Sequence, residues 1–172
     1  MSSHLHSFLT LLAGKNQAVV EPIIERLQLL NASPDEYFER YEEELNERGM
    51  YSATDYSTVE LQQIVLIDQL ERASLVAEVD WEADAEDISW NLARVASQQG
   101  YVLAEFPVIE DEELDTEQIL ASISRSLAAQ GFTLLEMDLN SDSYPIILIP
   151  TTSVESAHEM ATELGLTLRE DF

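Results

Sequence analysis

The hydrophobic periodicity of the chain changes at about residue 72, and this change limits the folds open to it. Before that point, apolar residues such as Leu5, Phe8 and Leu12 recur at the three-to-four spacing of amphipathic helices. After it, short runs with the period-two alternation of strands are separated by helix-like segments. We therefore predict an α+β protein in which N-terminal helices, residues 1–72, pack on a sheet part, residues 73–172.

In the sheet part the pattern predicts a mixed sheet of about five strands, with elements in the order β-α-β-α-β-β-α-β. Helices are expected at 85–99, 116–130 and 153–164, and "YVLAEF", residues 101–106, is predicted as the second strand. The run "IILI", residues 146–149, is apolar on both strand faces, which indicates a central strand covered on both sides. The two parts are expected to share one core, so that residues 1–172 form a single domain.

Local signals place two helices within the N-terminal part. The segment "SPDEYFERYEEELNERG" predicts one helix with Ser33 as its N-cap, Pro34 at its first position and Gly49 as its stop. Further on, Ser57 and Glu60 have the spacing of a capping box before an apolar run.

The charge of the chain is strongly negative, at −26 from 8 basic and 34 acidic side chains. Residues 1–72 contain 13 acidic and 5 basic side chains, whereas residues 73–172 contain 21 and 3. A chain with 45% hydrophobic residues is expected to fold despite this charge. The resulting field repels nucleic acid and anionic lipid, and it attracts cations and basic proteins.

Most catalytic chemistries lack their residues in this sequence. The chain contains no cysteine, which excludes thiolate nucleophiles and Cys-ligated zinc, and it has only three histidines and five glycines. Phosphate-binding and dinucleotide-binding motifs are absent. We therefore assign no catalytic residue, expect no cofactor and disfavour an enzyme. The N-terminus lacks a signal-peptide pattern and no segment approaches the ~18 apolar residues of a membrane span, so a cytoplasmic protein is expected.

The stretch from Ala77 to Leu92, "AEVDWEADAEDISWNL", places both tryptophans of the chain among six carboxylates. One interpretation is structural: the acids stabilise a helix N-terminus, Trp81 is buried at the end of a strand face, and Trp90 packs beneath the N-terminal helices. The other interpretation is a contact with a basic, partly apolar partner, because Trp90 lies off the apolar stripe of its helix. The partner-binding residues would then be Asp80, Trp81, Asp84, Glu86, Asp87 and Trp90.

A second acidic motif, "MDLNSDSYP", carries Asp138, Asn140 and Asp142 at alternate positions, as at the start of an EF-hand loop. The sixth position is Ser143 instead of glycine, and the twelfth is Ile149 instead of a bidentate glutamate. A polar hairpin turn is the alternative interpretation. These three residues are nevertheless the candidates for a divalent-cation site.

The segments "DWEADAEDISWNL" and "DLNSDSYPIILIP" resemble a bacterial family catalogued only as a domain of unknown function. The resemblance extends over about residues 73–165 and implies no activity, substrate or cofactor. The matching positions are Asp80, Trp81, Glu86, Asp87, Asp138, Ser141, Asp142, Ser143, Tyr144 and Pro150.

Two functional hypotheses follow from the sequence. The first is a non-enzymatic protein that binds a basic macromolecular partner through the acidic surface at Asp80 to Trp90 and residues 110–117, as toxin-neutralising proteins and nucleic-acid mimics do. No direct contact with nucleic acid or membrane is expected. The alternative is a divalent-cation-binding or carboxylate-based enzyme that uses Asp138, Asn140 and Asp142.

Overall fold

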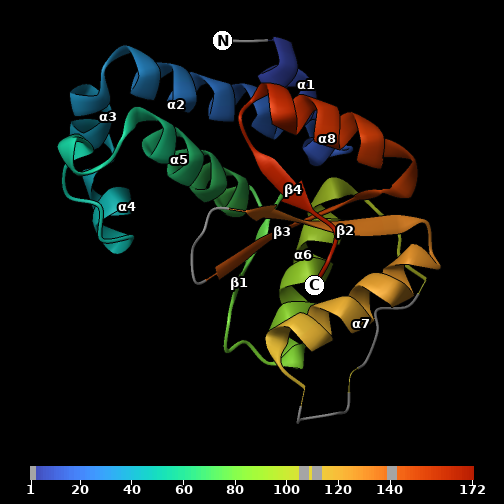
Figure 1. Cartoon of the computed structure of the whole chain (residues 1–172). Helices are drawn as coiled ribbons and strands as arrows, with labels where there is room; N and C mark the ends of the chain where they lie inside the picture. The colour runs from blue at the N-terminus through green and yellow to red at the C-terminus, as the bar shows by residue number, and fades with distance from the viewer. Residues whose placement is uncertain (1–2, 105–108, 110–113, 139–142) are drawn as a thin grey trace.

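The computed structural model describes residues 3–104, 109, 114–138 and 143–172, which form helices on both faces of one antiparallel sheet (Figure 1). The strands are β1 (Ala77–Asp80), β2 (Phe132–Asp138), β3 (Ser143–Pro150) and β4 (Thr167–Arg169). The α-helices are α1 (Ser3–Ala13), α2 (Val20–Ala32), α3 (Pro34–Arg40), α4 (Glu42–Glu47), α5 (Thr58–Arg72), α6 (Ala85–Gln99), α7 (Thr116–Ala128) and α8 (Val154–Glu163). Short 3-10 helices occur at Gln17–Val19, Ala53–Asp55 and Thr151–Ser153.

The sheet has four strands in the order β1-β3-β2-β4, and every neighbouring pair is antiparallel. The prediction of a mixed sheet of about five strands is therefore wrong, although the α+β class is confirmed. The prediction of a covered central strand is confirmed, because β3 lies between β1 and β2, and Ile146 and Ile149 are fully buried together with the two residues between them.

The strand expected at "YVLAEF" accounts for the difference in strand number. Residues 101–104 are described and have no strand structure, while Glu105 and Phe106 lie outside the described residues. Tyr101 instead stacks on Phe132 with a centroid distance of 5.0 Å, and Ala104 N–H donates to Gln130 Oε1. The alternating apolar residues of this segment therefore belong to a connection that packs against the rest of the protein. Periodicity alone does not distinguish such a connection from a strand.

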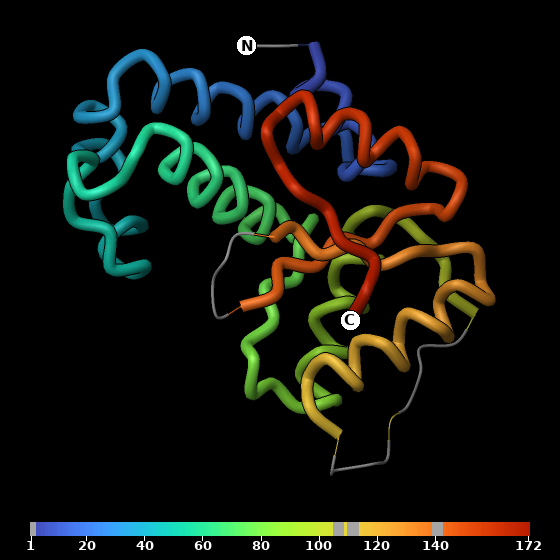
Figure 2. Tube along the Cα trace, viewed as in Figure 1, coloured from blue at the N-terminus to red at the C-terminus, as the bar shows by residue number. Residues whose placement is uncertain are grey.

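The sheet separates two hydrophobic clusters. On one face, Leu135, Met137 and Ile147 pack with the helices of the N-terminal part and with α8. On the other face, Leu134 and Ile146 pack with α6 and α7. Figure 2 shows α1, at the start of the chain, beside α8, near its end, and these two helices are in contact.

The helix expected from Ser33 to Gly49 is divided in two. α3 ends at Arg40 and α4 begins at Glu42, so the prediction of one continuous helix is wrong. Tyr41 lies at the break. The Arg26 guanidinium lies over its ring, 4.1 Å from the centroid, and the ring also contacts the buried Tyr37 ring, with 4.8 Å between the two centroids. Cation–π and aromatic contacts of this kind compensate for the interrupted helix.

The capping signals of other helices are confirmed. Ser57 Oγ accepts from Glu60 N–H while the Glu60 carboxylate accepts from Ser57 N–H, which is a complete capping box at the start of α5. Gly100, with φ of 72°, ends α6 in the left-handed conformation that glycine adopts readily. Within the described ranges, no helix is both long and apolar enough to cross a membrane.

Candidate functional site

The N-terminal ends of α6 and α7 lie at the same end of the molecule (Figure 1). Thr116, the first residue of α7, donates from its hydroxyl to the carbonyls of Trp81 at 2.7 Å and Ala83 at 3.3 Å, in the connection between β1 and α6. Tyr144 on β3 donates to the Glu117 carboxylate at 3.1 Å. We call this surface the acidic end and define it as Asp80, Trp81, Glu82, Asp84, Glu86, Asp87, Trp90, Asp115 and Glu117.

Trp81 is 57% exposed, so the expectation that it is buried at the end of the strand face is wrong. The strand face ends at Val79, because the chain turns directly after β1. In that turn Asp80 Oδ1 accepts from Glu82 N–H at 2.8 Å, and the Asp80 carbonyl accepts from Ala83 N–H at 3.0 Å. This local hydrogen bonding, which is typical of Asp, turns the chain before the period-two pattern reaches Trp81.

Trp90 is 64% exposed and does not pack beneath the N-terminal helices. The buried face of α6 contains Ile88, Leu92 and Val95, and Trp90 projects from another side of the helix, as the helical period predicts. The Arg94 guanidinium lies 5.7 Å from the centroid of the Trp90 ring and donates to Ser74 Oγ at 2.8 Å. The indole is therefore held on one side by a cation and is open to solvent elsewhere.

Part of the acidic character has a structural role. Asp84 Oδ1 accepts from Asp87 N–H at 2.8 Å and caps α6, while Asp115 and Gln118 form a capping box at the start of α7. Glu86 and Asp87 lie in the first turn of α6, where negative charge is favourable. Helix capping thus explains the presence of Asp84 and Asp115. It does not explain the other exposed carboxylates of the acidic end.

The carboxylates of the acidic end differ from other carboxylates of the protein in whether they have salt-bridge partners. Within the described part of the chain, none of them forms a salt bridge. Elsewhere, Arg48 bridges Asp68, Glu71 and Glu78 at 2.7, 2.5 and 2.8 Å. Sequence patterns do not predict this Arg48 network, because the three carboxylates lie 20, 23 and 30 residues from Arg48 along the chain. Arg48 and Arg72 therefore neutralise acids at the junction of α4, α5 and β1, whereas no described basic side chain forms a salt bridge with a carboxylate of the acidic end.

Two ionisable groups beside the acidic end have perturbed pKa values. Burial raises the pKa of Glu136, while Arg169 opposes the shift and the nearby carboxylates of Asp138 and Glu117 add to it. Burial likewise raises the pKa of Tyr144, and the hydrogen bond to Glu117 adds to the shift. Both shifts arise mainly from burial, and neighbouring carboxylates add to each of them.

The cation-site hypothesis rested on three residues, and only Asp138 lies within the described residues. Its carboxylate is 3.6 Å from Arg169 Nε. Asn140 and Asp142 lie outside the described residues, so their relation to Asp138 stays a prediction. Ile149, at the position where an EF-hand needs its glutamate, is fully buried. Among residues 3–104, 109, 114–138 and 143–172, no three His, Asp or Glu side chains are grouped closely enough to hold a metal ion.

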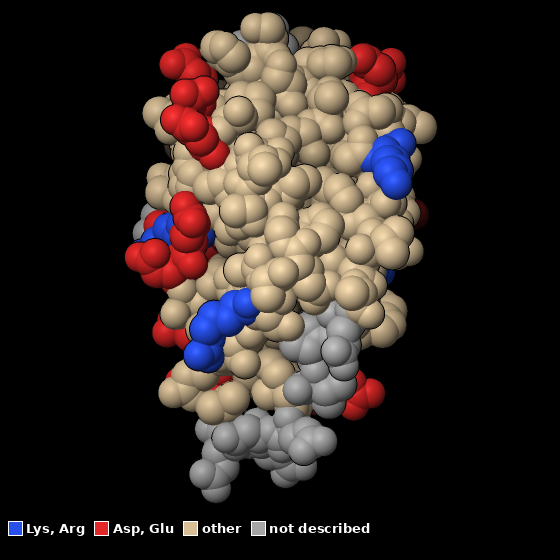
Figure 3. Space-filling model, turned by 90° about the vertical axis from the view of Figure 1, so that its right-hand side faces the viewer, with Lys and Arg blue, Asp and Glu red and all other residues tan. Residues whose placement is uncertain are grey.

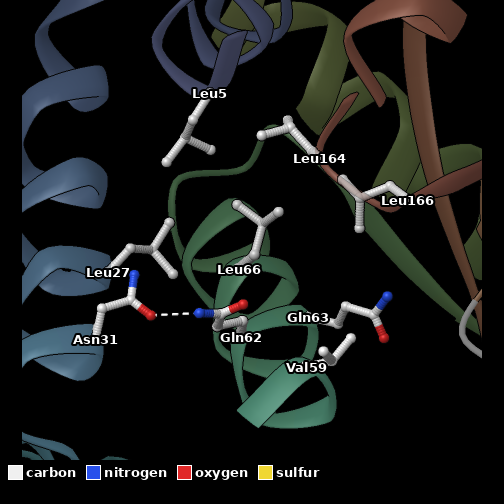
Figure 4. Close-up of a pocket in the computed structure, with 9 residues that line it drawn as sticks. All are labelled: Leu5, Leu27, Asn31, Val59, Gln62, Gln63, Leu66, Leu164 and Leu166. Atoms are coloured by element: carbon white, nitrogen blue, oxygen red, sulfur yellow. Dashed lines mark hydrogen bonds between the residues drawn. The ribbon is translucent and has the colours of Figure 1, made fainter. Parts of the chain in front are cut away.

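An uncharged pocket of about 180 Å³ lies between α1, α2, α5 and the end of α8 (Figure 4). The side chains of Leu5, Leu27, Leu66 and Leu164 form its apolar walls. Gln62 Nε2 donates to Asn31 Oδ1 at its rim. No acid, base or nucleophile lines the pocket, which suits it to apolar contact and not to chemistry.

The fold and this surface define an α+β protein with an exposed, uncompensated acidic end that carries both of its tryptophans. The chain belongs to the family described as Domain of unknown function (DUF6630), whose model matches residues 4–171. The match confirms the resemblance seen at the two sequence motifs and extends it to the N-terminal helices. No curated protein and no solved structure shows a match to the chain.

Proposed function

We propose that the protein is a non-enzymatic binding protein that recognises a basic partner protein through its acidic end. The observation that carries the proposal is the exposure of both tryptophans, 57% for Trp81 and 64% for Trp90, among carboxylates that form no salt bridge with any described residue. Tryptophan is among the residues most enriched at the energetic centres of interfaces, and here two of them are exposed in one acidic stretch.

The two kinds of side chain have different tasks in such a contact. The carboxylates attract a basic surface over a distance and orient it, which raises the association rate. The indoles then lose water on contact and supply affinity. A toxin-neutralising protein or a nucleic-acid mimic works in this way, since each presents carboxylates to a surface that is itself basic.

The test must separate this surface from the general charge of the molecule. In one variant, Glu82, Glu86 and Asp87 are changed to lysine, and the helix cap Asp84 is kept. In a control variant of equal net charge, the exposed residues Glu39, Glu42 and Glu43 of α3 and α4 are changed to lysine. Both variants and the wild type are used to capture proteins from a lysate of the source cell, and one captured basic protein is purified for binding measurements.

We expect the wild type and the α3–α4 control to bind that protein with similar Kd, and the acidic-end variant to bind it at least tenfold more weakly. Equal loss in both variants would show that only the net charge matters. Equal retention in both would show that the contact lies elsewhere. Either result would reject the acidic end as the binding surface.

A further inference from the structure

The C-terminal ends of α6 and α7 form a second distinctive surface, opposite the acidic end. Four connections of the chain meet there: residues 14–18, 97–104, 128–133 and 150–153. Lys15 N–H donates to the Gln99 carbonyl at 3.0 Å, Thr151 N–H to the Gly131 carbonyl at 2.9 Å, and Ala104 N–H to Gln130 Oε1 at 2.9 Å. These bonds join the four connections into one surface, which we call the uncharged end.

The uncharged end contains no Asp or Glu, although about one residue in five of the whole chain is acidic, and its one charged residue is Lys15. Figure 3 looks onto this side of the molecule and shows a middle without charged side chains, with acidic and a few basic side chains along the borders. Burial does not explain the lack of acids, since Gln98, Val102, Ala129 and Thr151 are exposed. The exclusion of acids from this exposed surface therefore marks it as a candidate interface.

The chemistry of the surface suits protein contact. Val102 is 88% exposed, the most exposed large apolar side chain of the described residues, and the small side chains of Ala104, Ala128 and Ala129 in these connections are exposed as well. The backbone beneath is fixed, because Gln99 Nε2 donates to the carbonyls of both Leu12 and Leu148, at 2.7 and 3.0 Å. A surface whose backbone is already fixed loses little conformational entropy on association.

The charge of the molecule indicates which partner fits. A basic protein gains nothing at the uncharged end and is drawn to the acidic end instead. A second copy of the same chain, at −26, is repelled by every acidic surface and can approach only where acids are absent. Since α6 has 15 residues, roughly 22 Å separate the two ends, and two molecules joined at their uncharged ends hold their acidic ends several Debye lengths apart.

We propose that the uncharged end is the contact surface of a two-fold symmetric homodimer, centred on Val102, that leaves both acidic ends free. A two-fold pair is the commonest oligomer of soluble proteins, and here it places the Val102 surface of one copy against that of the other. This inference is independent of the proposed partner binding, because it concerns the opposite end of the molecule.

Sedimentation equilibrium of the purified protein over a wide concentration range tests the dimer. The test variant is Val102→Asp, with Ala129→Glu as a second variant at the same end. The control is Val59→Asp, which places the same charge on another exposed valine, 60% exposed in the first turn of α5. All four proteins should have similar melting temperatures when monomeric, because each substituted side chain is exposed.

We expect the wild type and Val59→Asp to form a dimer with the same dissociation constant, and that constant to rise at least tenfold in Val102→Asp and Ala129→Glu. Added salt should tighten the wild-type dimer by screening the remaining repulsion between copies. A wild type that is monomeric at every concentration would overturn the proposal. A dimer that Val102→Asp and Ala129→Glu leave intact, or that Val59→Asp weakens equally, would also overturn it.

Discussion

Arg48 shows how single residues hold this acidic protein together. Its guanidinium contacts carboxylates from α5 and β1, and one of them, Asp68, is buried and also accepts from Arg72 at 3.0 Å and Gln69 at 2.8 Å. Removing one member of a partly buried ionic network leaves the others without compensation, which costs more than the network contributes when intact.

We predict that Arg48→Ala lowers the free energy of unfolding by about 2 kcal/mol, a value between those of exposed and buried ion pairs. The control is Arg40→Ala, whose ion pair with Glu36 at 2.6 Å is about half exposed on both sides, so the loss should stay under about 0.5 kcal/mol. Urea denaturation of both variants gives the comparison. Equal losses would mean that the Arg48 network contributes no more than a surface pair.

Glu136 gives a pH prediction with a defined sign. Burial raises its pKa above the ordinary 4.5, so the folded state favours the protonated carboxyl group. The stability that the fold gains from this protonation is lost as pH rises through the raised pKa. Glu136→Gln should therefore raise the melting temperature at neutral pH, and the difference from the wild type should shrink at pH below 4.5. Melting curves at both pH values measure it, and a difference that does not change with pH would contradict the assigned role.

At the scale of elements, local signals located most helices and the four observed strands, because capping residues and apolar periodicity act over a few neighbours, but they did not predict the break between α3 and α4. The errors occurred where a distant contact or a local turn overrides the periodic pattern. Tyr101 stacks on Phe132, which lies 31 positions away, and that contact holds the segment in a connection. Trp81 leaves its strand because Asp80 forms a turn, and the Arg48 network joins residues that share no local pattern.

The central position of β3 gives a sharp test of the sheet. Ile146 is fully buried and pairs with both Ala77 and Glu136, so a carboxylate at this position would have neither water nor a partner. Ile146→Asp should cost several kcal/mol and leave the chain largely unfolded, given total stabilities of about 5 to 15 kcal/mol. Val59→Asp serves as the control, because an acid in the first turn of α5 is favourable. Circular dichroism that shows a native melt for Ile146→Asp would contradict the assignment of β3.

At the scale of the whole molecule, charge is distributed unequally between two ends. The sequence predicts an acidic surface at Asp80 to Trp90 and shows the net charge of the whole chain, and the fold adds that the other ends of α6 and α7 meet connections without acids. That arrangement depends on which connections meet at the ends of α6 and α7. This is a property of the chain topology and cannot be predicted from any short stretch of sequence.

Salt dependence tests the balance of charge. Carboxylates without salt bridges repel one another in the folded state, so added salt should raise the melting temperature by screening that repulsion. The rise should occur with sodium chloride and should be similar with potassium chloride, which excludes specific cation binding as its cause. A melting temperature independent of ionic strength would show that the acids are already compensated.

The most direct test of the account uses the intrinsic fluorescence of the two tryptophans, since both belong to the acidic end. In the free protein, we predict the emission maximum of a water-exposed indole and ready quenching by acrylamide, a neutral quencher that the charge does not repel. Addition of the purified basic partner should move the emission to shorter wavelength and protect the indoles, with saturation at one partner per chain. Binding of the partner without any change in tryptophan emission or quenching would contradict the claim that the acidic end is the recognition surface.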